Sequence, residues 1–180
     1  MQGKLELIIG NMFSGKSTEL IRRINTTKSI NKNILVINYS LDNRYSSQNE
    51  ISTHDLQKMK CLKVSFIKDS FDLVNDYDSI FIDEGQFFPD LYDSVIMLVE
   101  KFNKHVIVSG LDGDSNRSVF GDMIRLIPMC DTVDKLRAYC NKCNDGTYGP
   151  FTKKISGSPS ELLDIGGSDK YIPVCRKHFN

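Results

Sequence analysis

The sequence predicts an α/β fold in which helices flank a parallel sheet, with a small subdomain at the C-terminus. Short apolar runs alternate with segments of helical periodicity, an order typical of doubly wound sheets with right-handed crossovers. Two runs, Ser79–Asp83 and His105–Leu111, are apolar almost throughout, as expected of strands buried on both faces. From about Ala138 the composition changes to Cys, Gly, Pro, Ser and Lys without a long periodic element. We therefore expect one domain over residues 1–137 and a smaller one over residues 138–180.

The individual elements follow from the spacing of apolar residues. The chain opens with a strand at Lys4–Ile9 and a glycine loop at Gly10–Lys16. A helix is expected from Ser17 to about Lys28, because apolar residues recur there at helical spacing. The polar stretch Ser40–Ser52 has no periodicity and is typical of a functional loop. Further strands are expected at Asn33–Tyr39, Leu62–Phe66, Ser79–Asp83 and His105–Leu111, and a further helix at Asp90–Phe102.

Composition excludes several classes of protein. The chain has 180 residues, of which 40% are hydrophobic and 26% charged, the balance of an ordinary globular protein. Its 23 basic and 23 acidic residues cancel, so there is no overall charge to attract nucleic acid or anionic membranes. The N-terminus has no signal-peptide core, and the apolar stretches are short. We expect a cytoplasmic protein with no nucleic-acid or membrane partner.

The cysteines predict a metal site. Their number is five, and an odd count argues against a secreted disulfide framework. Two knuckles, Cys140-Asn-Lys-Cys143 and Cys175-Arg-Lys-His178, offer four nitrogen and sulfur ligands and no open position, which indicates structural zinc. The alternative is a redox-active CxxC pair with His178 as an unrelated terminal residue.

A phosphate-binding loop lies between the first strand and the first helix. Its pattern is GxxxxGKS, in which glycines turn backbone N–H groups toward phosphate oxygens and the helix N-terminus favours negative charge. Lys16 would reach the outer phosphates, and the Ser17 hydroxyl would ligate Mg²⁺. A strand-to-helix turn that binds nothing is the alternative. The motif predicts a P-loop NTPase-type sheet with ATP contacts from Gly10, Asn11, Met12, Phe13, Ser14, Gly15, Lys16, Ser17 and Thr18.

Two acids follow the strand that ends at Ile82. A parallel sheet presents the carboxyl ends of its strands to the ligand, so Asp83 and Glu84 should lie beside the phosphates. One acid would hold Mg²⁺, directly or through water. Glu84 would either orient a water for hydrolysis or remove a proton from an acceptor hydroxyl. These residues alone leave both an ATPase and a kinase open, besides a solvated acidic pair without a role.

The ordered set of motifs resembles one family over nearly the whole chain, the type II thymidine kinases of animals, bacteria and large DNA viruses such as poxviruses. The resemblance rests on LIIGNMFSGKSTELIRR, Asp42-Asn43-Arg44-Tyr45-Ser46, Thr53-His54-Asp55, IFIDEGQFFPD, VIVSGLDG, the two knuckles and the run from Ile165 to Tyr171. It implies transfer of the ATP γ-phosphate to the 5'-hydroxyl of thymidine, with Glu84 as general base. It also implies that Lys16 and Arg44 contact the phosphates and that Ser17, Asp42 and Asp83 support Mg²⁺.

The resemblance further implies a nucleoside pocket closed by a long loop. Its residues would be Met12, Phe87, Leu111, Ser115, Phe120 and Thr152, with Leu162, Leu163, Asp164, Ile165, Gly166 and Tyr171 from the loop. A homotetramer and feedback inhibition by thymidine triphosphate are implied as well. The absence of an extension beyond Asn180 favours a viral or bacterial origin.

This chain departs from the family at two positions. Ser115 stands where the family commonly has an aromatic residue, so we expect one wall of the nucleoside pocket to be altered. His178 stands where many members have cysteine, and imidazole is an equally good zinc ligand.

Two other functions remain as hypotheses from the sequence. A nucleic-acid motor would use Asp83 and Glu84 to activate water, but the balanced charge and the single small core argue against it. A nucleotide-binding regulator without chemistry is opposed by the retained Lys16, Ser17 and both acids, although Ser115 keeps it open.

Overall fold

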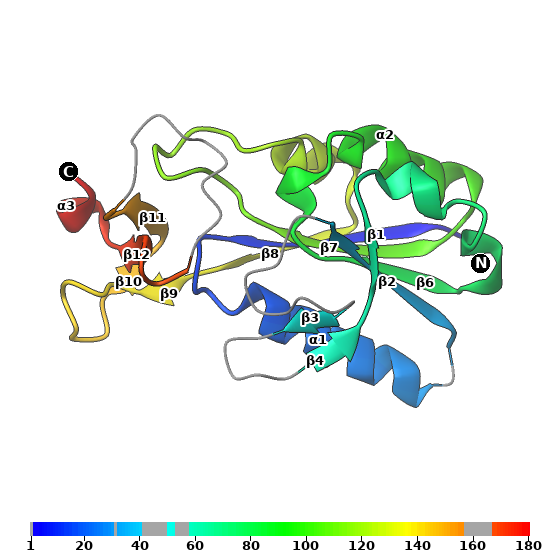
Figure 1. Cartoon of the computed structure of the whole chain (residues 1–180), viewed down its shortest axis with the longest axis horizontal. Coiled ribbons are helices and arrows are strands. Elements are labelled where there is room, and N and C mark those ends of the chain that lie inside the picture. The colour runs from blue at the N-terminus through cyan, green and yellow to red at the C-terminus, as the bar shows by residue number, and fades with distance from the viewer. Residues whose placement is uncertain (1, 31, 41–49, 53–57, 157–166) are drawn as a thin grey trace.

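A central sheet of six parallel strands organises the chain (Figure 1). The computed structural model describes residues 2–30, 32–40, 50–52, 58–156 and 167–180. The strand order is β5-β2-β6-β7-β1-β8, and every neighbouring pair is parallel. The strands are β1 (Lys4–Gly10), β2 (Ile34–Tyr39), β5 (Leu62–Val64), β6 (Ser79–Ile82), β7 (His105–Gly110) and β8 (Thr132–Leu136). The predicted fold class, a parallel α/β sheet, is confirmed.

Helices cover both faces of this sheet (Figure 1). On one face lies α1 (Lys16–Ser29), whose buried residues pack with Ile8 and Phe81. On the other face lie α2 (Leu91–Ile96), its π-helical continuation η4 (Met97–Lys101) and the 3-10 helix η5 (Met123–Met129). Because successive strand residues point to opposite faces, Leu7 belongs to the core under α2 while Ile8 belongs to the core under α1.

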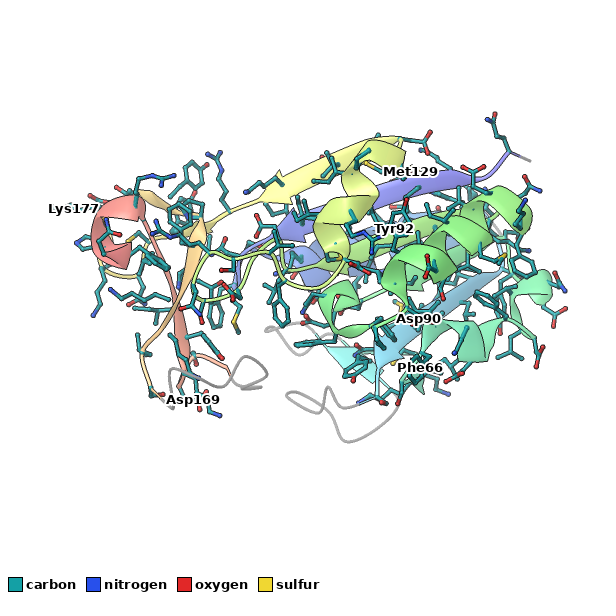
Figure 2. All side chains as sticks on the ribbon, turned by 90° about the horizontal axis from the view of Figure 1, so that it is seen from above. Phe66, Asp90, Tyr92, Met129, Asp169 and Lys177 are labelled. Carbon is teal, nitrogen blue, oxygen red and sulfur yellow. The ribbon has the colours of Figure 1, made fainter. Side chains whose placement is uncertain are left out.

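Three shorter 3-10 helices connect the strands on the α2 side: η1 (Ile67–Ser70), η2 (Val74–Asp76) and η3 (Gly85–Phe87). Asp90, labelled in Figure 2, joins η1 to the start of α2. Its carboxylate accepts the N–H groups of Ile67 and Lys68, each at 3.0 Å, and the Ser94 hydroxyl at 2.7 Å. No helix in the described part of the chain has the length and apolar character needed to cross a membrane.

The C-terminal part forms two small antiparallel sheets and a short helix, separate from the main sheet (Figure 1). The elements are β9 (Ala138–Tyr139) paired with β10 (Tyr148–Gly149), β11 (Phe151–Lys154) paired with β12 (Tyr171–Val174), and α3 (Arg176–Phe179). Cys140, Ile172 and Val174 are buried together in a core of their own. The absence of a long element among the described residues of this part agrees with the sequence.

The expected strands and helices are present, with ends that differ by one to two residues. Among the strands before residue 138, two features were not expected. The strand β8 follows η5 and forms one edge of the main sheet, next to β1. It escapes pattern recognition because four of its five residues are exposed, so no apolar run marks it. At the end of the stretch expected to be a loop, β3 (Glu50–Ser52) forms a strand that pairs with β4 (Lys58–Lys60), for which no element was predicted.

A cluster of charged residues lies around Glu6 on the α1 side of the sheet. The Glu6 carboxylate is 2.7 Å from Arg23, 2.6 Å from Lys4 and 3.0 Å from His105. The hydrogen bond with His105, helped by that with Lys4, outweighs partial burial and lowers the pKa of Glu6 from 4.5 to about 2. A carboxyl whose pKa is depressed on folding stabilises the protein above its unfolded pKa, and this contribution is lost as the pH falls toward the folded pKa.

We expect Glu6 to account for part of the acid sensitivity of the fold. The free energy of unfolding should fall as the pH decreases from 4.5 toward 2, the interval between the two pKa values of Glu6. In Glu6→Gln, stability at neutral pH should be lower and its decline over this interval shallower, as measured by urea unfolding at a series of pH values. Glu100→Gln, at an exposed position on η4, should keep the parent slope. Equal slopes for Glu6→Gln and the parent would contradict this assignment.

Candidate active site and metal centre

The phosphate-binding loop lies between β1 and α1, as predicted. Gly15 adopts the left-handed conformation, with φ of 84°, and forms the N-cap of α1. A Cβ at Gly10 would approach the carbonyl oxygen of Leu136 in β8 to 2.4 Å, so only glycine fits there. The Lys16 ammonium donates to the Asn11 carbonyl at 2.8 Å and is 9% exposed. The loop therefore holds its lysine inside the turn that is expected to surround the phosphates.

Asp83 and the loop serine lie together at the carboxyl edge of the sheet. The Ser17 hydroxyl is 3.3 Å from one Asp83 oxygen, and the other oxygen accepts the Ser109 hydroxyl at the end of β7. Asp83 is 4% exposed, and β7 lies between its strand, β6, and β1. A hydroxyl beside a buried carboxylate is an oxygen pair of the kind that Mg²⁺ prefers. Ser109 was not expected at the site, because it is small and lies within an otherwise apolar run.

Glu84 has a strained backbone and a fixed side chain. Its φ is 54°, a left-handed conformation that is uncommon for residues other than glycine and concentrated at functional sites. The Gln86 amide donates to the Glu84 carboxylate at 2.5 Å, and its oxygen accepts the N–H of Leu111 at 2.9 Å. Gln86 is 4% exposed and thus links the predicted base to the loop after β7. Its only sequence signal was that it is a polar residue two positions after Glu84.

Several residues predicted to bind the nucleoside come together in one apolar cluster. Met12, Leu111 and Tyr171 are buried against one another, with Phe120 packed beside them. Phe87 meets Phe120 edge to face, with ring centroids 5.5 Å apart. Tyr39, which the sequence did not indicate, stacks on Phe87 with centroids 5.7 Å apart. The cluster joins the phosphate loop, η3 and the C-terminal subdomain, and its binding role stays a prediction.

Two further predicted residues lie outside the cluster itself. The Thr152 hydroxyl accepts the N–H of Met12 at 3.0 Å, so this threonine contacts the phosphate loop directly. Ser115 instead lines a different pocket, of about 360 Å³, with Lys153 and Phe179. The altered wall expected at Ser115 stays a prediction.

Part of the predicted site lies outside the described residues: Asp42, Arg44, Leu162, Leu163, Asp164, Ile165 and Gly166. Their expected roles at the phosphates, Mg²⁺ and the nucleoside stay predictions.

The four predicted metal ligands form one group, with their ligand atoms all within 4.8 Å of one another. The His178 Nδ1 atom is 3.6 Å from the Cys140 sulfur and 3.4 Å from those of Cys143 and Cys175. The sulfurs of Cys143 and Cys175 are 3.8 Å apart. Tetrahedral zinc with Zn–S of about 2.3 Å and Zn–N of about 2.1 Å requires edges of about 3.8 and 3.6 Å. The donor set therefore fits zinc. His178 lies within the group and is not the unrelated terminal residue that the redox alternative supposes.

Thiol ionisation in this group also fits a cation. Burial raises the pKa of Cys140, but backbone N–H groups of the knuckles and His178 outweigh it and lower the pKa to about 6. Burial, together with the neighbouring sulfurs of Cys140 and Cys175, raises the pKa of Cys143 to about 11. The site thus favours a thiolate at Cys140 and disfavours one at Cys143, and a bound divalent metal would supply the positive charge that stabilises thiolate ligands.

Known proteins agree with this geometry. The family described as thymidine kinase matches residues 3–179. The chain is 42% identical to the thymidine kinase of monkeypox virus over 177 residues, which is 98% of this chain and 97% of that protein. Identity is 41% to that of vaccinia virus strain Western Reserve, with the same coverage. It is 40% to that of Choristoneura fumiferana entomopoxvirus, over 98% of this chain and 96% of that protein. The resemblance seen in the sequence is confirmed, and the chain belongs to the thymidine kinase family.

Proposed function

We propose that this protein is an ATP-dependent thymidine kinase that transfers the γ-phosphoryl group of ATP to the 5'-hydroxyl of thymidine. The observation that carries the proposal is the hydrogen bonding around Glu84 and Asp83. Through Gln86, Glu84 is linked to Leu111, a member of the apolar cluster, and it directly follows Asp83, which contacts the phosphate-loop Ser17. A base in this position faces a nucleoside acceptor as well as ATP, whereas hydrolysis alone needs no apolar cluster.

In the proposed reaction, the oxygen of the thymidine 5'-hydroxyl bonds to the γ-phosphorus of ATP, and Glu84 accepts the proton that this hydroxyl loses. The bond from that phosphorus to the β–γ bridging oxygen breaks, and ADP leaves with the electron pair. Lys16 and Arg44 stabilise the charge that develops on the transferred group, while backbone N–H groups of the phosphate loop hold ATP in place. The apolar cluster orients the thymine ring and excludes water that would compete for the phosphoryl group.

Two metals complete the proposal. Magnesium bound with ATP would be held by Ser17, Asp83 and Asp42. The magnesium ion would neutralise part of the negative charge on the phosphates. Structural zinc would be held by the four knuckle ligands and supplies cohesion to the subdomain proposed over residues 138–180.

The assembly and regulation of the enzyme rest on its family. We propose a cytoplasmic homotetramer, inhibited by thymidine triphosphate in the acceptor site. The exposed edge strand β8 supports oligomer formation, because an unpaired strand edge is a template for another chain.

The acceptor dependence of ATP consumption tests the function. The purified protein is incubated with ATP and Mg²⁺ and with thymidine, deoxyuridine, deoxycytidine or no nucleoside, and the products are separated by chromatography. We expect thymidine 5'-monophosphate and ADP in equal amounts, and little ADP without nucleoside. Deoxyuridine reports how far Ser115, in place of the aromatic residue common in the family, relaxes selectivity. Equal ATP hydrolysis in all samples would support the motor hypothesis instead, and binding of ATP without turnover would support a regulator.

A further inference from the structure

The second residue of the phosphate loop, Asn11, is buried between the loop and the C-terminal subdomain. Only 2% of its surface is exposed. Its side-chain amide donates to the Gly149 carbonyl at 2.9 Å, and its side-chain oxygen accepts the N–H of Ala138 at 3.4 Å. Ala138 and Gly149 face each other in the β9–β10 pair. One side chain thus spans both strands of the small sheet that leads, two residues after Ala138, into the metal ligand Cys140.

The main chain of the same residue holds the catalytic side of the loop. The Asn11 carbonyl accepts both the Lys16 ammonium and the Ser14 hydroxyl, each at 2.8 Å. A shift of the Asn11 side chain would therefore move the Asn11 carbonyl, which accepts the hydrogen bond from Lys16.

A second link runs parallel to the first. The Thr152 hydroxyl accepts the N–H of Met12, the next loop residue, at 3.0 Å. Thr152 is 5% exposed and lies opposite Pro173 in the β11–β12 pair. Pro173 is two residues before the metal ligand Cys175. Both knuckles are therefore joined to the phosphate loop through a short strand and one hydrogen-bonding side chain.

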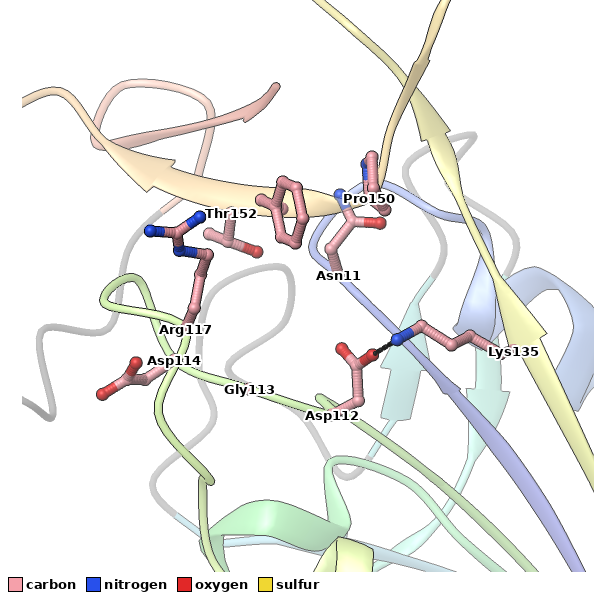
Figure 3. A pocket seen from close by; sticks show the side chains of 9 residues that line it. Asn11, Asp112, Gly113, Asp114, Arg117, Lys135, Pro150 and Thr152 are labelled. Atoms are coloured by element: carbon pink, nitrogen blue, oxygen red, sulfur yellow. Dashed lines mark ion pairs between the residues drawn. The ribbon is translucent and has the colours of Figure 1, made fainter. Parts of the chain in front are cut away.

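A pocket lies beside this junction. The pocket, of about 140 Å³, is lined by Asn11, Pro150 and Thr152 together with the Asp112–Lys135 ion pair (Figure 3). The buried contact of Met12 with Tyr171 also joins the loop to the C-terminal part, but it cannot pair the Gly149 carbonyl or the Ala138 N–H, and an unpaired buried carbonyl or N–H is costly. Without the Asn11 side chain, a movement of the phosphate loop should therefore no longer be transmitted to the two knuckles.

We propose that Asn11 is a positioning residue that couples the metal centre to the phosphate loop, so that bound nucleotide and bound zinc stabilise each other. The inference rests on the proposed ATP and zinc sites. Nucleotide orders the loop, and the ordered loop holds the β9–β10 pair, so the local opening that releases zinc becomes less frequent. Because linkage is reciprocal, zinc must strengthen nucleotide binding by the same factor.

The rate of zinc release to a chromogenic chelator tests the coupling without reference to activity. It is measured on the zinc-loaded protein with and without a saturating non-hydrolysable ATP analogue and Mg²⁺. In the parent, nucleotide should slow release about fivefold or more, and in Asn11→Ala by less than about twofold. Thr152→Val, which keeps the side-chain volume and removes the acceptor for Met12, should give an intermediate ratio. The Lys135 side chain lines the same pocket and pairs with Asp112, so Lys135→Gln should keep the parent ratio.

Three further measurements keep the outcomes separate. Zinc content and the circular dichroism spectrum identify which variants are folded, and analogue binding is titrated on each. The coupling is refuted if the analogue binds the parent but leaves zinc release unchanged, or if it slows release equally in Asn11→Ala and Lys135→Gln. Failure of the analogue to bind the parent at all would instead refute the proposed function, and this inference with it.

Discussion

Replacing Glu84 with glutamine is expected to lower kcat for thymidine phosphorylation by about 10²–10⁴-fold, the usual contribution of a positioned general base. The amide has the size of the carboxylate but cannot accept the proton of the 5'-hydroxyl. Thymidine and ATP should bind nearly as in the parent, because the pocket walls and the phosphate loop are unchanged. Steady-state kinetics with saturating Mg²⁺–ATP separates kcat from KM, and equilibrium titration gives the two affinities.

The matched control is Glu100→Gln, the same chemical change at an exposed position on η4, which should have the parent kcat. A Glu84→Gln enzyme with nearly the parent kcat would mean that another group accepts the proton. A loss confined to KM would mean that Glu84 binds substrate and does not act in the chemical step.

Removal of one metal ligand is expected to have the largest effect on stability. Cys140→Ala deletes the most buried of the four ligands and leaves three donors that cannot complete a tetrahedral site. Structural zinc contributes about 10–16 kcal/mol of apparent binding free energy in small domains. Loss of a third of that contribution in a chain of this length would lower Tm by about 10 °C or more. Zinc content should fall well below the parent value of one ion per chain, and thermal unfolding followed by circular dichroism gives the shift in Tm.

Cys61→Ala is the control, because Cys61 lies in the core near α1 and outside the metal group. It should retain one zinc per chain and undergo at most a modest packing loss. Full zinc content in Cys140→Ala would contradict the assignment of this cysteine as a ligand. A fall in Tm that the parent does not also show after zinc is chelated would point to packing around Cys140 as the cause.

The features recovered from the sequence are those with a local signal. The strands at Ser79 and His105 are runs of buried residues, and the phosphate loop is a string of eight residues with a known conformation. The knuckles were paired correctly although 31 residues separate them, because zinc requires four ligands and each knuckle supplies two.

The features that were missed depend on partners far away in the chain. Asn11 contacts Gly149 across a sequence separation of 138 residues, and nothing near either residue indicates the other. The same holds for Gln86 and Leu111, which are 25 residues apart. When a motif position accepts many residue types, a polar side chain there does not by itself indicate a structural role. That role becomes visible only once its hydrogen-bond partner is known.

The position of β1 constrains the order in which the protein forms. Although it is the first strand synthesised, β1 pairs only with β7 and β8, from the second half of the chain. Leu5 also donates its N–H to Asp131, 126 residues away, at 2.7 Å. Such contacts have high contact order, and a nascent chain must keep β1 unpaired until residues beyond 105 have left the ribosome. The nucleotide site therefore matures late in translation, and a product truncated before β8 exposes β1 as a sheet edge prone to aggregation.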